Sequence, residues 1–305
     1  MTHLRAQACS LAESSRPVGP LGRLVPGICV WVVQSALALL VPCVPAFAGA
    51  EAAVEAFSIS QGTDVISGEV HRLDGSEPSN ALIVVGGSGV CQREDTGSAV
   101  PMFLSEATAV VLVDRRGCGA STGTFVRPAT RNSRWLVPRI AMDVEAVAAF
   151  LRSSGFDRVV AVGSSFGGWV VLSAAAAGAF DAFVTINGGG SSVAVSDAFD
   201  HFTDQGMAID EAIVATEAEE LPRSYDPALD LKLTSVPSLW VLSELDDSNP
   251  AELDRASIDH WRRAGRPFEI LVLGGVNHEL IHLETGDVDL SWLPYAIELI
   301  EGRGG

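Results

Sequence analysis

Short apolar runs alternate with helical segments along the chain beyond residue 50. Several runs end in glycine, as in 81–85 followed by Gly86, and short apolar runs bounded by glycine are typical of buried parallel strands. Parallel neighbours need a crossover connection, which the intervening helical segments can supply. The pattern therefore predicts an α/β fold, with a mostly parallel central sheet and helices on both faces.

The same pattern gives the expected elements. We expect strands at 57–60, 68–73, 81–85, 109–113, 158–162, 183–186, 238–242 and 268–273, and helices at 139–153, 166–177, 250–264 and 290–300. Sheets of this kind place their functional groups at the carboxyl ends of the strands. The loops that follow these strands are therefore where a site is expected.

Residues 191–235 interrupt the alternation because they contain no convincing strand. Helical patterns at 197–202 and 209–220 are followed by a proline-rich stretch. The segment lies between two expected strands, so it must leave the sheet and return. We interpret it as a small helical cap insertion over the site, and structurally inert padding is the alternative.

The N-terminal segment has the pattern of a secretory signal peptide. Basic residues precede an apolar run at 28–41, which is too short to span a bilayer as a helix. Ala46 and Ala48 flank Phe47, which predicts cleavage after Ala48 or after Ala50. We therefore expect a signal peptide at 1–48, a mature domain at 49–305 and a secreted or periplasmic location.

An uncleaved membrane anchor is the alternative for this segment, and the length of the leader leaves open a start codon downstream of Met1. Lipid attachment at Cys43 fits poorly, because Pro42 occupies a position that normally takes a very small residue.

Two cysteines, Cys91 and Cys118, stay in the mature chain, and both fall in loops at the same expected edge of the sheet. In an oxidising compartment they can pair, and two free thiols are the equal alternative.

The formal net charge of −18 argues against a nucleic-acid-binding surface, which needs clustered lysine and arginine to neutralise phosphates. Against this acidic background, one local basic cluster lies near the expected site edge: Arg127, Arg131, Arg134 and Arg139. Arginine matches the geometry of a carboxylate, so the cluster could bind an acidic group of a substrate. Ion pairing with the acidic surface is the simpler interpretation.

Ser165 stands in a G-x-S-x-G motif, Gly163 to Gly167, that follows one expected strand and opens a helix. A nucleophilic serine needs such a sharp turn to expose its hydroxyl, and small residues two before and two after it allow the backbone to close. The motif alone is common, but its position between strand and helix makes it specific. A capping serine in an ordinary turn is the alternative.

A serine hydroxyl is a weak nucleophile without a base, and the base needs an acid that orients it. After a serine in this setting, the acid follows in the chain and the histidine comes last. His278 follows the expected strand at 268–273 and is the predicted base, with His282 as its main rival. The remaining histidines, His71, His201 and His260, have the wrong chain order or setting.

The acid is expected just after the strand at 238–242, where Asp246 is the prediction and Asp247 the runner-up. Glu244 and Asp247 are otherwise solvated loop charges. Hydrolysis also needs backbone amides that stabilise the oxyanion. We expect these from Phe166, directly after the serine, and from Ser88 in the glycine-rich loop at 86–89. That loop lacks the Gly-Lys-Ser/Thr of a phosphate cradle, so nucleotide binding is not expected.

Together these residues resemble the α/β-hydrolase superfamily over about 57–300, and within it the bacterial esterase and acylaminoacyl-peptidase-like group. The resemblance is carried by the oxyanion loop at 87–95, D-x-R-G-x-G-x-S-x-G at 114–123, G-x-S-x-G-G at 163–168, the acid loop at 240–246 and the histidine loop at 275–278. It implies the α/β-hydrolase fold and a Ser165–Asp246–His278 triad. Two departures stand out: Gly86 replaces a histidine that braces the oxyanion loop in many relatives, and Ser243 replaces a glycine.

The expected function is a serine hydrolase that cleaves carboxylic esters of small or medium acyl groups through an acyl-enzyme. Peptidase or thioesterase activity of the same fold is one alternative, and a non-catalytic ligand-binding homologue is another. The chemistry needs no cofactor and no metal. The expected partner is a small ester or acyl substrate, with no nucleic acid and no stable membrane span after signal cleavage, and the sequence leaves the oligomeric state open.

Overall fold

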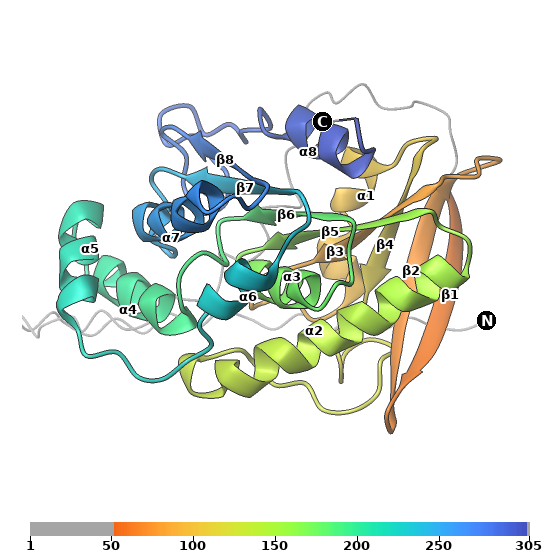
Figure 1. Ribbon diagram of the computed structural model, residues 1–305, viewed down its shortest axis with the longest axis horizontal. Helices are drawn as coiled ribbons and strands as arrows, with labels where there is room; N and C mark the ends of the chain where they lie inside the picture. The colour runs from red at the N-terminus through yellow and green to blue at the C-terminus, as the bar shows by residue number, and fades with distance from the viewer. Residues whose placement is uncertain (1–51, 304–305) are drawn as a thin grey trace, which may run out of the picture. The chain divides into compact units, whose positions relative to one another are not determined.

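The computed structural model describes residues 52–303, and the predicted signal peptide lies outside them. One eight-stranded sheet forms the centre of this part of the chain, in the order β1-β2-β4-β3-β5-β6-β7-β8 (Figure 1). The strands are β1 (Ala52–Gln61), β2 (Asp64–Leu73), β3 (Asn80–Val85), β4 (Thr108–Val113), β5 (Arg158–Ser164), β6 (Ala182–Ile186), β7 (Ser238–Ser243) and β8 (Phe268–Leu273). From β4 to β8 every neighbouring pair is parallel, while β1 and β2 are antiparallel additions. The predicted α/β fold with a mostly parallel sheet is confirmed.

Helices pack against both faces of the sheet. The helices of the described residues are η2 (Arg93–Thr96), α1 (Ala99–Phe103), α2 (Thr130–Ser153), α3 (Phe166–Ala176), α4 (Val193–Asp204), α5 (Ile209–Ala218), α6 (Ala228–Leu233), α7 (Ala251–Arg263) and α8 (Leu293–Ile300). Buried residues of α2, α3, α6 and α7 form one apolar cluster with the sheet, and those of α1 and α8 form the other. Because both faces are covered, β6 and β7 are buried along their whole length, as expected of central parallel strands.

Helix α2 begins at Thr130, well before the start at 139 that the sequence predicts. Pro138 lies inside it and cannot donate the backbone hydrogen bond of an ordinary helical residue. Tertiary contacts hold the early turns instead: the Thr130 amide donates to Asp197 on α4 at 3.0 Å, and Ser133 Oγ accepts from the Tyr225 amide at 2.9 Å. These contacts come from the segment between β6 and β7, so local sequence could not reveal them.

Three helices, α4, α5 and α6, occupy the segment between β6 and β7. Figure 1 shows α4 and α5 standing apart from the β1–β2 end of the sheet. Helical patterns at 197–202 and 209–220 indicated α4 and α5, and both helices exist with different bounds. Among the described residues, no helix is long and apolar enough to cross a membrane.

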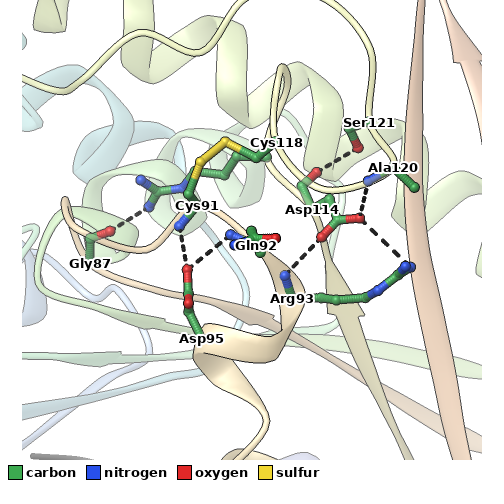
Figure 2. The surroundings of a disulfide bond; sticks show 10 residues. Gly87, Cys91, Gln92, Arg93, Asp95, Asp114, Cys118, Ala120 and Ser121 are labelled. Atoms are coloured by element: carbon green, nitrogen blue, oxygen red, sulfur yellow. Dashed lines mark hydrogen bonds and ion pairs between the residues drawn. A yellow bond between two sulfur atoms is a disulfide. The ribbon is translucent and has the colours of Figure 1, made fainter. Parts of the chain in front are cut away.

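Cys91 and Cys118, whose pairing the sequence left open, form a disulfide with a Cα–Cα distance of 5.6 Å (Figure 2). It joins the loop after β3 to the turn after β4. Buried Asp114 fastens the same two segments, because its carboxylate accepts from the amides of Arg93 at 2.8 Å and Ala120 at 2.9 Å. The loops that follow β3 and β4 therefore form one cross-linked unit.

Replacing both Cys91 and Cys118 with alanine should lower the free energy of unfolding by about 3 kcal/mol, since the disulfide closes a loop with a sequence separation of 27. Urea denaturation of the two proteins measures the difference. A reducing agent should destabilise the unmodified protein and leave the double variant unchanged, which serves as the control. Equal midpoints for both proteins without reductant would contradict the prediction.

Candidate active site

Ser165 lies on a sharp turn between β5 and α3, with φ 52° and ψ −121°. A non-glycine residue in this region is strained by about 1–3 kcal/mol and persists only where its surroundings hold it. Two glycines make room for the turn: a side chain at Gly163 would overlap the Gly167 carbonyl, and one at Gly167 would overlap the Val85 carbonyl. The motif thus closes for the steric reason that its sequence suggested.

The backbone around Ser165 is fixed by hydrogen bonds to its neighbours. The Ser165 amide donates to Ile186 O at 2.8 Å, and the Gly168 amide donates to Ser165 O at 2.9 Å. Gly87 in the loop after β3 approaches so closely that a Cβ there would lie 3.3 Å from Ser165 Cβ and 3.6 Å from Oγ. The serine hydroxyl therefore faces the glycine-rich loop.

His278 and Asp246 meet directly. His278 Nδ1 lies 2.9 Å from both carboxylate oxygens of Asp246, so the ring donates its Nδ1 proton to the carboxylate and leaves Nε2 as the other nitrogen. Asp246 is 2 % exposed, and its Oδ1 also accepts from the amides of Ser248 at 2.9 Å and Asn249 at 2.8 Å. The carboxylate is thus held by the loop after β7 and oriented toward the ring.

The environment raises the pKa of His278 above its ordinary value. Burial lowers this pKa, but the negative charge of Asp246 and the hydrogen bond to it raise it, and Glu279 and Asp247 add to the increase. The net direction is upward because the carboxylate stabilises the imidazolium. The pair can therefore hold a proton on the ring more readily than a free histidine would.

Asn187, which sequence reasoning missed, connects the loops that carry these groups. It directly follows Ile186, the residue that accepts from the Ser165 amide, and it is 2 % exposed with φ 51°. Its Nδ2 donates to His278 O at 2.8 Å and to Ser243 Oγ at 2.9 Å, while its Oδ1 accepts from the Ser243 amide at 2.8 Å. Ser165 and His278 are therefore both tied to residues 186–187, at the carboxyl edge of the sheet.

The structure gives no hydrogen bond between Ser165 Oγ and the His278 ring among the residues it describes. Its hydrogen bonds place the two residues at the same edge of the sheet through their backbones. The hydrogen bond between a catalytic serine and its base is often long in the absence of substrate and shortens when substrate binds.

The rival residues have other partners. His282 Nε2 pairs with Asp289 at 3.1 Å, His71 with Glu69 at 3.4 Å, and His201 with Gln205 at 2.6 Å. His260 packs against the ring of Trp261 on α7. Glu244 and Asp247 are exposed, in contrast to buried Asp246. Only His278 joins its ring to a predicted acid within the described part of the chain.

The two predicted oxyanion donors flank Ser165. Phe166 is the first residue of α3, where backbone N–H groups have no partner within the helix. Ser88 lies in the loop after β3, directly after the Gly87 that approaches the serine. Its amide donates to no other described residue. Both amides are therefore available.

Helix α4 contacts the acid loop from the segment between β6 and β7. Thr203 Oγ1 donates to Asp247 O at 2.5 Å, and Ser196 Oγ hydrogen-bonds Asn249 Oδ1. Burial raises the pKa of Asp200, while its hydrogen bond with Ser248 and the charge of His278 oppose that increase. The helical segment therefore lies beside the acid loop and within electrostatic reach of His278.

The arginine cluster lies on α2 and the loop before it. Arg139 pairs with Asp64 at 3.5 Å, as the simpler interpretation expected. Arg127, Arg131 and Arg134 are exposed and form no ion pair within the described part of the chain. In that same part, no group of histidine, cysteine, aspartate and glutamate side chains is arranged to hold a metal ion.

A mostly parallel sheet, a strained serine between strand and helix, and a buried Asp–His pair at the same sheet edge are features of the class of α/β hydrolases. The model of the alpha/beta hydrolase family matches residues 82–296, so the chain belongs to that family. A comparison with curated proteins finds no match.

Solved structures share the fold at low sequence identity. An esterase of Pyrococcus furiosus is 14 % identical with a TM-score of 0.61, and the alignment covers 83 % of this chain and 91 % of that one. A proline iminopeptidase of Mycobacterium smegmatis is 15 % identical with a TM-score of 0.57, covering 82 % and 98 %. An acylaminoacyl peptidase of Pyrococcus horikoshii is 17 % identical with a TM-score of 0.54, covering 74 % of this chain but 37 % of that one. The chain is thus similar to hydrolases with different named activities.

Gly167→Ala should lower the melting temperature, because its Cβ would come closer than 3.0 Å to the backbone carbonyls of Val85 and Gly86. Backbone cannot move aside as a flexible side chain can, so we expect the free energy of unfolding to fall by about 1–3 kcal/mol. Gly274→Ala is the control, since its nearest contact would be 3.5 Å and its φ is not positive. Similar melting temperatures for both variants would show that the turn is looser than described.

Asp246→Asn should lower the pKa of His278, because it removes the charge that opposes the effect of burial. The His278 ring resonances, titrated by NMR, measure the change. Asp247→Asn, an exposed neighbour, should shift that pKa far less. An unchanged His278 pKa in Asp246→Asn would contradict the pairing.

Proposed function

We propose that the protein is a serine hydrolase that cleaves carboxylic esters of small or medium acyl groups. The observation that carries the proposal is the Asp246–His278 pair, with Nδ1 bonded to both carboxylate oxygens, at the same sheet edge as the strained Ser165 turn. Membership of the alpha/beta hydrolase family supports the reaction class. The esterase of Pyrococcus furiosus provides a structural parallel for ester substrates.

In the proposed mechanism, Ser165 Oγ attacks the ester carbonyl while its proton passes to His278 Nε2. The tetrahedral oxyanion accepts hydrogen bonds from the amides of Phe166 and Ser88. The intermediate collapses to an acyl-enzyme, and the alcohol leaves with the proton from His278. Water then loses a proton to His278, attacks the acyl group, and the carboxylic acid leaves as Ser165 regains its proton. Asp246 fixes the tautomer and stabilises the imidazolium in both halves.

The raised pKa of His278 sets the expected pH dependence. The base must be neutral to accept the serine proton, so activity declines as pH falls through this pKa.

We also propose export with cleavage of residues 1–48, and the Cys91–Cys118 disulfide agrees with an oxidising compartment.

Ser165→Ala should lower the turnover of p-nitrophenyl acetate by at least about 10³-fold, because no other group supplies the nucleophile. Ser164→Ala is the matched control: this exposed serine is the last residue of β5, directly before Ser165, and its loss should leave the rate within about twofold. Mass spectrometry should find a fluorophosphonate probe attached to Ser165. Equal hydrolysis by the unmodified protein and Ser165→Ala would refute serine catalysis and favour a ligand-binding role.

Matched substrates separate the related activities. A p-nitrophenyl ester, a p-nitroanilide and a thioester of one acyl group should be compared by kcat/KM. We expect the ester to be preferred. Preference for the anilide or the thioester would assign the same site to peptidase or thioesterase chemistry.

A further inference from the structure

Arg115 is a buried cation that the proposed mechanism does not use. It directly follows Asp114 at the end of β4 and is 9 % exposed. Its Nη2 donates to Gly86 O at 2.5 Å and to Gly87 O at 2.8 Å, and both bonds reach the loop that approaches Ser165 (Figure 2 shows the Gly87 carbonyl). The Arg115 side chain is thus hydrogen-bonded to the backbone carbonyls of the glycine-rich loop.

These two bonds fix the directions of two amide N–H groups. In a planar trans peptide the C=O of one residue and the N–H of the next point in opposite directions. Holding Gly87 O on the Arg115 side therefore turns the Ser88 N–H away from it, and holding Gly86 O does the same for the Gly87 N–H. Donation to a carbonyl also polarises its peptide group and strengthens the N–H as a donor.

Arg115 also contacts the residue that supplies the other predicted donor. Its guanidinium carbon lies 5.6 Å from the centre of the Phe166 ring, within the range of a cation–π interaction. One side chain thus contacts both Phe166 and the glycine-rich loop that contains Ser88. Arg115 thereby helps to fix the position of the loop after β3 relative to the start of α3.

The backbone of Arg115 is itself clamped. Its amide donates to Cys91 O at 3.0 Å, its carbonyl accepts from the Cys118 amide at 2.9 Å, and the disulfide joins these two cysteines (Figure 2). Burial lowers the pKa of Arg115 to about 10, and the charge of Asp95 opposes that decrease, so the guanidinium is charged at neutral pH. The glycine-rich loop is therefore held by a charged side chain whose own backbone is hydrogen-bonded to both cysteines of the disulfide.

We propose that Arg115 is a positioning residue that aims the Ser88 amide at the oxyanion through the Gly87–Ser88 peptide. Gly86 and Gly87 have no side chains that could support the loop, so this support comes from Arg115 after β4. The inference rests on the proposed hydrolase function. Its consequence is specific: loss of Arg115 weakens transition-state stabilisation more than substrate binding.

Arg115→Met should lower kcat for p-nitrophenyl acetate by about 10–100-fold with KM within about twofold. Without Arg115 the Ser88 amide is no longer held in the right direction, so part of its stabilisation of the oxyanion is lost. Affinity for a trifluoromethyl ketone, whose adduct with serine carries the oxyanion, should fall by a similar factor. Arg115→Lys should recover part of kcat, since an ammonium can donate to one carbonyl but lacks the planar fork. Titration with a fluorophosphonate gives kcat per folded site and so removes any effect of partial unfolding.

Arg116→Met is the matched control. Arg116 is the next residue and pairs with Asp64 and Asp143, away from the glycine-rich loop. Its loss should lower the melting temperature and leave kcat per site within about twofold. Equal kcat losses in the two variants, or an unchanged kcat in Arg115→Met, would overturn the positioning role alone. If the unmodified protein neither turns over the ester nor reacts at Ser165, the proposed function fails and the inference fails with it.

Discussion

The strained backbone at Ser165 is the constraint on which the arrangement of the site depends. A residue at φ 52° is held there because three backbone segments meet around it: the end of β3, the first turn of α3 and the residues after β6. A side chain at Gly188 would overlap Ser165 O, just as one at Gly167 would overlap Val85 O. The glycines therefore do more than permit a turn, because they let the backbone before the glycine-rich loop and the backbone around Asn187 approach the serine closely.

Asn187 extends this constraint to the acid and the base. Its side chain holds the start of the acid loop through Ser243 and the histidine loop through His278 O, and its carbonyl accepts from Asn249 Nδ2 at 2.8 Å. Asn249 in turn donates its amide to Asp246. A buried, fully hydrogen-bonded network of this kind fixes loop positions more firmly than the same number of exposed bonds. The position of Asp246 relative to the serine turn is thus set by side chains that take no part in the chemistry.

Local signals explain which of these features could be predicted from the sequence. The strand–serine–helix context, the glycines and the apolar runs act over a few residues, so the fold and the sharp turn at Ser165 could be predicted. Asn187 gave no signal, because its role depends on partners from β7 and from the acid and histidine loops, far away in the sequence. The early turns of α2 were missed for a related reason, since Pro138 argues against a helix and the contacts that override it come from Asp197 and Tyr225. The disulfide stayed open because pairing depends on the distance between two loops.

The strand order explains why these contributions converge. The chain passes from β3 to β4 in one direction across the sheet, whereas β5 to β8 follow in the other, so the direction reverses between β3 and β5. Loops at such a switch point diverge to opposite sides and leave a crevice at the carboxyl ends of the strands. The glycine-rich loop follows β3 and Ser165 follows β5, so both flank this point. On one side the segment after β4 supplies Arg115 and Cys118, which contact the loop after β3, and on the other the loops after β7 and β8 supply Asp246 and His278. Each half of the proposed chemistry is therefore built on its own side of the sheet, and the serine stands where the two meet.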